Sequence, residues 1–315
     1  MTTPPANISV TLPVSQALDR VKRVLFQPFD PGKWFVIGFC AWLAHLAEGS
    51  GFNFHGPGGG GDGWHSGDFR HEFDHAKEYI LNNLYWIVPV AIAFAVFCLA
   101  LWWLLTWLSS RGRFMFVHCV ALDKAEVVVP WRKFAREGNS LFWFRIVLGL
   151  AGLVLMVPLL AATGVVTFGL LARGGLLVPS ILGLIGLVLV VAAMGIVFFL
   201  IAKLTTDFVV PIMYRQRHGC WTSWGILLGL LKANVSVFIL WLLFQIVLGL
   251  AIGVLVFTVV LVTCCCAGCL FALPYLGTVF LLPVLMFKRC YSLYFLAQFG
   301  PGYDAFAVAE PPTAG

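Results

Sequence analysis

The chain has 315 residues, of which 61% are hydrophobic and only 11% are charged. Soluble globular proteins carry about 25% charged residues, so this composition excludes an ordinary soluble domain. The net charge of +6 needs no nucleic-acid partner, because the basic residues border long apolar runs, where they can meet anionic lipid headgroups.

We expect no export signal in the N-terminal segment, which continues into an amphipathic stretch. Met1–Pro13 is polar and lacks the basic and apolar regions of a signal peptide. Val14–Leu25 places apolar side chains at i, i+3, i+4 and i+7, with charged residues between them. Pro130–Arg136 and Trp221–Lys232 repeat this arrangement with tryptophan on the apolar face. We expect all three to be cytoplasmic interfacial helices that lie in the plane of the lipid headgroups.

Long apolar stretches dominate the rest of the chain. A spanning helix needs about 20 apolar residues, because only a helix satisfies its own backbone hydrogen bonds in hydrocarbon. Six stretches approach this length: Trp34–Ala47, Leu81–Trp107, Leu141–Leu171, Leu176–Ala202, Val235–Val262 and Leu270–Ala297. The sequence therefore predicts an all-α polytopic membrane helix bundle with about six transmembrane helices. We expect one integral membrane domain, residues 1–299, and a disordered cytoplasmic tail, residues 300–315.

The basic residues predict the orientation of this bundle. Of the 20 Lys and Arg residues, all except Arg70, Lys77 and Arg173 fall on one side of the membrane when the six stretches are threaded through it. Lys and Arg are enriched in cytoplasmic loops. We therefore expect both termini to be cytoplasmic and the protein to reside in a prokaryotic inner membrane.

The predicted outer loop, residues 50–78, combines a glycine-rich run with several His and acidic residues. His71–His75 reads HEFDH and matches the H-E-x-x-H pattern, in which two histidines bind zinc and the glutamate activates a water. Glu78 continues the same helical face, so His71, His75 and Glu78 are the candidate metal ligands. The alternatives are a solvated acidic helix, a non-catalytic zinc site and a zinc metalloprotease. We expect no other cofactor.

Polar residues that could act within the bilayer are few. His45, Glu48 and Asn82 lie near the predicted outer ends of the first two spans and could begin a polar path for a solute. Intramembrane ionisable groups mark carriers, but none of those in this chain falls clearly at the predicted midplane. A transport pathway is therefore an alternative rather than the leading hypothesis.

At the cytoplasmic ends of the spans, Asp207 is expected to form a structural ion pair with Arg145 or Lys203. The turn between the fifth and sixth spans holds a cluster of thiols, Cys264, Cys265, Cys266 and Cys269. These cysteines could bind a soft metal, form a disulfide or serve as small apolar residues.

Two patterns suggest repetition and close helix packing. Phe144–Ala151 reads FRIVLGLA and Phe244–Ala251 reads FQIVLGLA, which indicates either an internal duplication or a chance match between apolar segments. The pairs Gly225/Gly229 and Gly249/Gly253 have the small-xxx-small spacing that lets helices approach closely.

Four short motifs carry a resemblance to known proteins. They are Ser110–Phe114 (SRGRF), Pro130-Trp131, Gly138–Phe142 (GNSLF) and Asp207–Pro211 (DFVVP). From Leu108 onward the chain resembles an uncharacterised group of prokaryotic multi-span membrane proteins, and its layout is similar to the membrane domain attached to glycerophosphodiester phosphodiesterases. The resemblance implies no catalytic residues. The soluble phosphodiesterase barrel is not found in this sequence, so we do not expect that activity.

Three functional hypotheses follow. The leading one is a non-enzymatic integral membrane protein that organises lipids or partner proteins, another membrane protein or further copies of itself as an oligomer. The second is a transporter or channel for a small or lipid-like solute. The third is an outer-face zinc-binding protein or metalloprotease that uses His71, Glu72 and His75.

Overall fold

The computed structural model describes residues 8–47, 83–172, 178–263 and 273–308, and every regular element among them is a helix. The elements are α1 (Leu12–Val21), the π-helix η1 (Lys22–Phe26), α2 (Pro31–His45), α4 (Leu84–Leu122), α5 (Val128–Lys133), α6 (Ala135–Ala172), α7 (Val178–Leu204), the π-helix η2 (Thr205–Val209), α8 (Val210–Gln216), α9 (Cys220–Ala233), α10 (Val235–Val262), α12 (Pro274–Phe280), α13 (Leu282–Ala297) and the 3-10 helix η3 (Phe306–Val308). The all-α prediction is confirmed for these residues.

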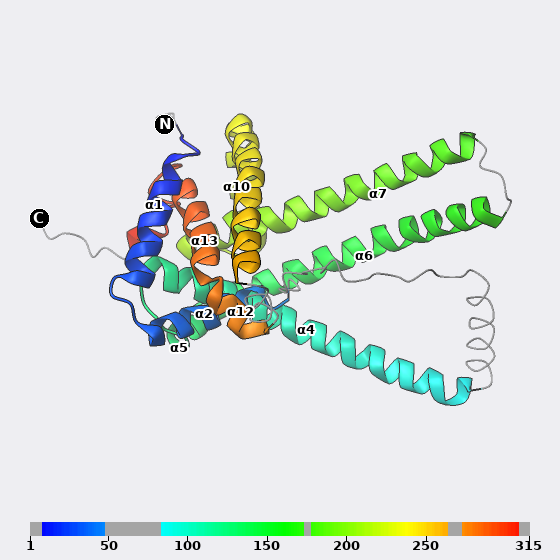
Figure 1. Ribbon diagram of the computed structural model, residues 1–315, viewed down its shortest axis with the longest axis horizontal. Coiled ribbons are helices and arrows are strands. Elements are labelled where there is room, and N and C mark those ends of the chain that lie inside the picture. Colours follow the sequence, from blue (N-terminus) through cyan, green and yellow to red (C-terminus); the bar gives the residue numbers. More distant parts are fainter. Residues whose placement is uncertain (1–7, 48–82, 173–177, 264–272, 309–315) are drawn as a thin grey trace, which may run out of the picture.

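Three long helices project from a packed base. Figure 1 shows α4, α6 and α7 extending to one side, while α10 leaves in a different direction. The base consists of α1, η1, α2, η2, α8, α13 and the adjoining parts of α4, α6 and α9. Within α4, large apolar side chains between Tyr85 and Leu104 are mostly exposed, whereas Phe114–Ala121 is buried. One continuous helix therefore presents a lipid-compatible surface at one end and a protein core at the other.

Four helices in the described residues are long and apolar enough to cross a membrane. They correspond to Tyr85–Leu122, Ala135–Thr167, Leu182–Gln216 and Val235–Val262. These match four of the six predicted spans, the second to the fifth, and support an integral membrane protein.

The predicted first and sixth spans need correction. The described part of the first is α2, whose 15 residues give a length of about 22 Å, short of the roughly 30 Å hydrocarbon core. The sixth is broken into α12 and α13 at Leu281, and α13 is largely buried in the base. Hydropathy did not separate these cases, because a helix enclosed by protein can be as apolar as one enclosed by lipid.

The contact between α2 and α4 depends on Gly112. A Cβ atom at this position would lie 2.7 Å from both the backbone nitrogen of Ala44 and the carbonyl carbon of Leu43. Next to it, the Ser109 hydroxyl donates a 2.7 Å hydrogen bond to the Ala44 carbonyl. The backbone of α2 therefore lies directly on α4, which only glycine permits at this point.

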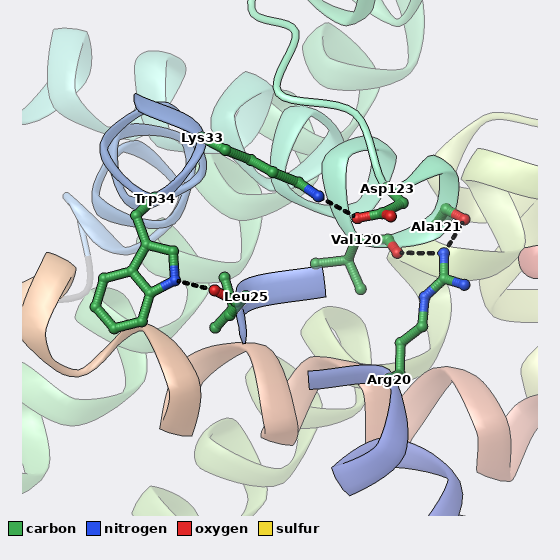
Figure 2. A network of polar contacts seen from close by, with 7 residues as sticks. All are labelled: Arg20, Leu25, Lys33, Trp34, Val120, Ala121 and Asp123. Atoms are coloured by element: carbon green, nitrogen blue, oxygen red, sulfur yellow. Dashed lines mark hydrogen bonds and ion pairs between the residues drawn. The ribbon is translucent and has the colours of Figure 1, made fainter. Parts of the chain in front are cut away.

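Two cations from the N-terminal helices hold the end of α4 (Figure 2). Arg20 Nη2 donates to the carbonyls of Val120 and Ala121 at 3.2 and 2.8 Å. Lys33 Nζ lies 2.8 Å from the Asp123 carboxylate, at a residue with φ of 57° that ends the helix. The last carbonyls of a helix lack intrahelical partners and carry partial negative charge, so cations stabilise this end.

The two ends of the described chain meet in the base. Ser9 and Gln298 exchange two hydrogen bonds, of 2.8 and 2.9 Å, between backbone and side-chain amide. The apolar face of α1 packs on α13 through Ala17 and Val21, so in this structure it is covered by protein. Residues 300–308, which we predicted to begin a disordered tail, include η3, whose Phe306 ring stacks on Tyr294 at 4.3 Å.

A first prediction concerns the contact between α2 and α4 at Gly112. Gly112→Ala should lower the thermal unfolding midpoint of the purified protein in detergent, at a cost of about 1–3 kcal/mol, because the added methyl group meets backbone that cannot rotate away. Gly225→Ala on α9 is the control, since its Cβ would meet no described atom within 4 Å. Equal midpoints for the two variants would show that α2 does not approach α4 this closely.

A second prediction concerns Arg20, which caps the end of α4. Arg20→Gln should reduce the free energy of unfolding by about 1.5–3 kcal/mol, the range for a hydrogen bond to a charged group. Arg23→Gln removes the same charge from an exposed position on η1 and should be nearly neutral. Denaturation followed by circular dichroism would compare the two, and equal losses would indicate a general charge effect instead of capping.

Candidate functional site

An aromatic band marks the place where the long helices leave the base. The Trp103 ring of α4 contacts Trp143 of α6 edge-on, with centroids 6.0 Å apart. The Arg111 guanidinium lies over the rings of Trp107 and Trp131, at 4.5 and 4.9 Å, in a cation–π arrangement. Tryptophan and tyrosine favour the membrane–water interface, so this band is suited to lie at headgroup level.

The opposite end of α4 carries a second aromatic pair. Tyr85 is 83% exposed and contacts Trp86 at 5.8 Å. Trp86 and Trp103 are separated by about 26 Å along the helix, close to the thickness of a bilayer hydrocarbon core. All side chains from Ile87 to Leu101 are apolar. This half of α4 therefore has the dimensions and composition of a membrane crossing.

A cavity of about 520 Å³ lies in the base, where α2, α4, the junction of α7 with η2, and α13 meet. We call it the basal cavity. Its wall includes His45, Arg113, Lys203, Asp207, Lys288 and Arg289, together with Ala44, Phe116, Phe199, Ala202, Thr206 and Leu285. Among the described residues, four cations, one carboxylate and a histidine thus line the same space.

Three polar contacts organise this wall. Lys203 and Asp207 form an ion pair of 2.9 Å across one turn, which confirms the predicted pairing of Asp207 and selects Lys203 as the partner. Arg289 Nη1 donates a 2.6 Å hydrogen bond to the Thr206 carbonyl within the π-helix η2. His45 Nδ1 lies 2.8 Å from the Ala41 carbonyl and must carry a proton there, because a carbonyl only accepts.

Most of the described charged residues of the basal cavity are cations. Arg113 and Arg289 are buried, with 4% and 6% of their surface exposed. Lys288 keeps contact with solvent, yet its pKa is lowered, chiefly by desolvation and further by the charge of Lys203, while Asp207 opposes the shift. Among the described residues that line the cavity, one carboxylate faces four cations.

An apolar groove lies beside the basal cavity, between α6 and α7. It has a volume of about 370 Å³ and shares Arg113 and Ala202 with the cavity. Apart from Arg113, Arg145 and Thr205, its lining is apolar: Phe144, Leu148, Gly149, Gly152, Met156, Phe198 and Ala202. From Arg145 to Met156 it follows α6 for about 16 Å. Space along α6 depends on glycine, since a Cβ at Gly152 would touch the Phe198 ring at 3.6 Å.

Arg145 is held at the base end of this groove. Its Nη1 donates to the hydroxyls of Ser109 and Ser110, at 3.1 and 3.4 Å. Asp207 was a predicted partner for Arg145, but Asp207 pairs with Lys203, and Arg145 donates to these two serines of α4. The serine contacts keep the guanidinium at the boundary between the polar cavity and the apolar groove.

A second polar cluster lies away from the cavity and has a structural role. His118 Nδ1 and the Tyr214 hydroxyl are 3.1 Å apart and buried, with the Phe134 ring stacked on Tyr214 at 4.8 Å. Arg217 covers Phe134, pairs with Glu137 at 3.3 Å and donates to the Lys133 carbonyl at 2.7 Å. These contacts join α5 and α6 to α8 and so hold the base together.

The predicted outer-loop site lies outside the described residues. This applies to His71, His75 and Glu78, to Glu48 and Asn82 of the polar path, and to the Cys264–Cys266 and Cys269 cluster. The metal and polar-path hypotheses therefore stay predictions. Within the part of the chain that the structure describes, no group of three or more His, Cys, Asp or Glu residues is arranged to hold a metal ion.

Of the predicted site residues, His45 is the one that the structure places. It lies at the end of α2, beside Phe116 of α4, and lines the basal cavity. Ala44, next to it, contacts Gly112, which is about 43 Å along α4 from Asn83. His45 is therefore far from the start of α4, near which the polar path was predicted.

The convergence of Arg113, Lys203, Lys288 and Arg289 was not predicted from the sequence. Arg113 was placed in the loop after the second span, Lys203 after the fourth, and Lys288 and Arg289 together in the sixth. The available signal was the Lys288-Arg289 pair, which interrupts an apolar stretch with two adjacent cations. Such residues need a polar environment within the fold.

Comparison with known proteins gives a family and no activity. The chain matches a family of unknown function (DUF7544) over residues 9–282 and belongs to it. No curated protein and no solved structure matches the chain. A function for this protein must therefore be inferred from the geometry of the base.

Proposed function

We propose that this protein is a non-enzymatic integral membrane protein that binds and organises membrane lipids at the base of its long helices. The observation that carries the proposal is the cation-lined basal cavity with an apolar groove beside it, between two helices of spanning length; the two spaces share Arg113 and Ala202. A lipid likewise has a polar part, its headgroup, and an apolar part, its chains. Ligand sites commonly combine an apolar wall with a few placed polar groups.

The distribution of charge supports a cytoplasmic position for the base. The described long helices carry no Lys or Arg between residues 84 and 110, 146 and 172, 178 and 202, or 235 and 262. All the Lys and Arg residues of the described chain lie at the base or where the long helices join it. The positive-inside tendency then favours a base on the cytoplasmic face of a prokaryotic inner membrane, with both described chain ends beside it.

Partner proteins and self-association remain part of this proposal. The resemblance of the layout to the membrane domain attached to glycerophosphodiester phosphodiesterases, which is an expectation from the sequence alone, would fit a supporting role beside other proteins, and we transfer no activity from it. Transport is the alternative of a different class. It requires a polar path, and the described distal parts of α4, α6 and α7 carry no charged side chain that would support one.

Filling the groove tests the lipid-binding proposal. The double variant Gly149→Leu/Gly152→Leu should retain several-fold less lipid after purification in mild detergent, because the new side chains occupy the groove. A Cβ at either glycine meets only ring atoms at 3.6 Å or more, so the backbone should remain in place. The measurement is total lipid per protein by mass spectrometry.

Gly249→Leu/Gly253→Leu on α10 is the matched control, because a Cβ at these glycines meets no described atom within 4 Å. It should retain as much lipid as the unmodified protein. The proposal fails if the groove variant, folded by its melting curve, keeps the same amount of lipid as this control.

Orientation is tested separately by labelling Lys22→Cys on the exposed side of η1. A membrane-impermeant maleimide should modify this cysteine in inverted membrane vesicles and leave it unmodified in intact spheroplasts, because the base is expected to be cytoplasmic. The unmodified protein corrects for the native cysteines. Labelling in intact spheroplasts would place the base on the outer face.

A further inference from the structure

We infer that the groove between α6 and α7 holds one acyl chain of a membrane lipid from the leaflet on the side of the base, extended from Arg145 at the interface to Met156 near the midplane of the bilayer. The inference rests on the proposed lipid-binding function and specifies which part of the lipid enters the groove, how many chains fit and in which direction the chain runs. It follows from the position, the width and the lining of the groove.

The groove has the length and the position of one leaflet. Trp143, two residues before Arg145, belongs to the aromatic band that is suited to headgroup level. From Arg145 the groove follows α6 to Met156 over about 16 Å, and one leaflet contributes about half of the roughly 30 Å hydrocarbon core. There Met156 reaches toward α7, since its Cε lies 3.8 Å from the place of a Cβ at Gly195. The groove therefore begins at the interface and ends near the midplane.

The width of the groove fits a single chain. Its volume of about 370 Å³ over about 16 Å corresponds to a mean cross-section of about 23 Å². Apolar groups in contact lie about 4.0–4.5 Å apart, so one extended chain needs about 16–20 Å² and two chains need about twice that area. An extended chain advances about 1.2 Å per bond, so about 13 bonds fit between Arg145 and Met156. A fused-ring lipid is wider than one chain and does not match this cross-section.

The lining determines the direction of the chain. The polar residues of the groove all lie at the end beside the base: Arg113, Arg145 and Thr205. From Leu148 to Met156, α6 contributes only apolar side chains and glycines to the groove, and the Phe198 ring faces them from α7. Polar groups are costly to place in apolar surroundings, so the ester end of a lipid belongs beside the base and the methyl end beside Met156.

Acyl chains are the molecules that adjoin the groove in a bilayer. Leu150, Val154 and Val157 of α6 alternate with the lining residues and are exposed along the same length of the helix. Exposed apolar side chains on a helix of spanning length contact hydrocarbon. A chain of the surrounding lipid therefore lies next to the groove and can enter it without passing through water.

Photo-crosslinking of the full-length protein in proteoliposomes tests the inference. Two phosphatidylcholines would carry a diazirine at different carbons of one chain, about nine bonds apart, which corresponds to about 11 Å or about seven residues of helix. The probe nearer the ester should label Leu148 of α6 and Thr205 of η2, whereas the probe nearer the methyl end should label Met156 and Phe198. The label thus moves to higher residue numbers on α6 and to lower ones on α7, because the two helices are antiparallel. Peptide mass spectrometry locates it.

Met156→Trp fills the distal end of the groove and should reduce labelling of Phe198 by the methyl-end probe severalfold, while labelling of Leu148 by the ester-end probe stays unchanged. Val157→Trp places the same side chain on the exposed side of α6 and should change neither. Equal effects of the two variants would overturn the inference. The comparison of the two probes on the unmodified protein needs no variant, so it decides the question even if Met156→Trp does not fold.

Further outcomes separate the possible failures. If both probes label only Leu150, Val154 and Val157 while filling the groove still reduces lipid retention, the placement of the chain is wrong and the lipid-binding function stands. If filling the groove also leaves lipid retention unchanged, the proposed function itself fails. If a photoactivatable sterol labels Met156 and Phe198 and neither phosphatidylcholine does, the ligand is a fused-ring lipid and the assignment to an acyl chain is wrong.

Discussion

The close contact between α2 and α4 at Gly112 is the constraint on which the base and its cavity depend. It brings the Ala44 carbonyl within 2.7 Å of the Ser109 hydroxyl, and Ser109 in turn accepts a hydrogen bond from Arg145 of α6. Three helices are thereby connected through one serine. Arg113 follows Gly112 directly in α4, so the same contact also determines where this cation meets the end of α2. A bulkier residue at position 112 would separate the parts of the cavity wall as well as the helices.

The π-helix η2 forms the opposite wall of the cavity. It lies between α7, whose side chains are mostly exposed, and α8, in which Val210–Tyr214 is buried. An extra residue in a helical turn rotates the following side chains by about 100° relative to the preceding ones. The π-turn thus coincides with the change from a lipid-compatible helix to a core helix. It also carries the Thr206 carbonyl that holds Arg289, so the transition and the site share the same five residues.

The sequence predicted the parts of the fold that depend on composition alone. Four spans and the concentration of basic residues at one end follow from the cost of placing charge and unpaired backbone in hydrocarbon. The same reasoning could not identify α2 and α13 as helices of the base, because their apolar side chains are satisfied equally by protein or lipid. Glycine spacing was also insufficient. Gly225 and Gly249 belong to small-xxx-small pairs, but no described atom would lie within 4 Å of a Cβ at either position. Gly112, which does make a close helix contact, is not part of such a pair.

The candidate site was hidden for a related reason. Arg113, Lys203 and Arg289 come from three distant parts of the chain, and each alone has the character of a charge that ends a span. They meet only because α13 lies within the base and returns Lys288 and Arg289 to the ends of α4 and α7. A sixth helix that crossed the membrane in full would have presented Lys288 and Arg289 as isolated charges in an apolar segment, at a considerable cost. Placing α13 in the base removes that cost and gathers the cations beside an apolar groove.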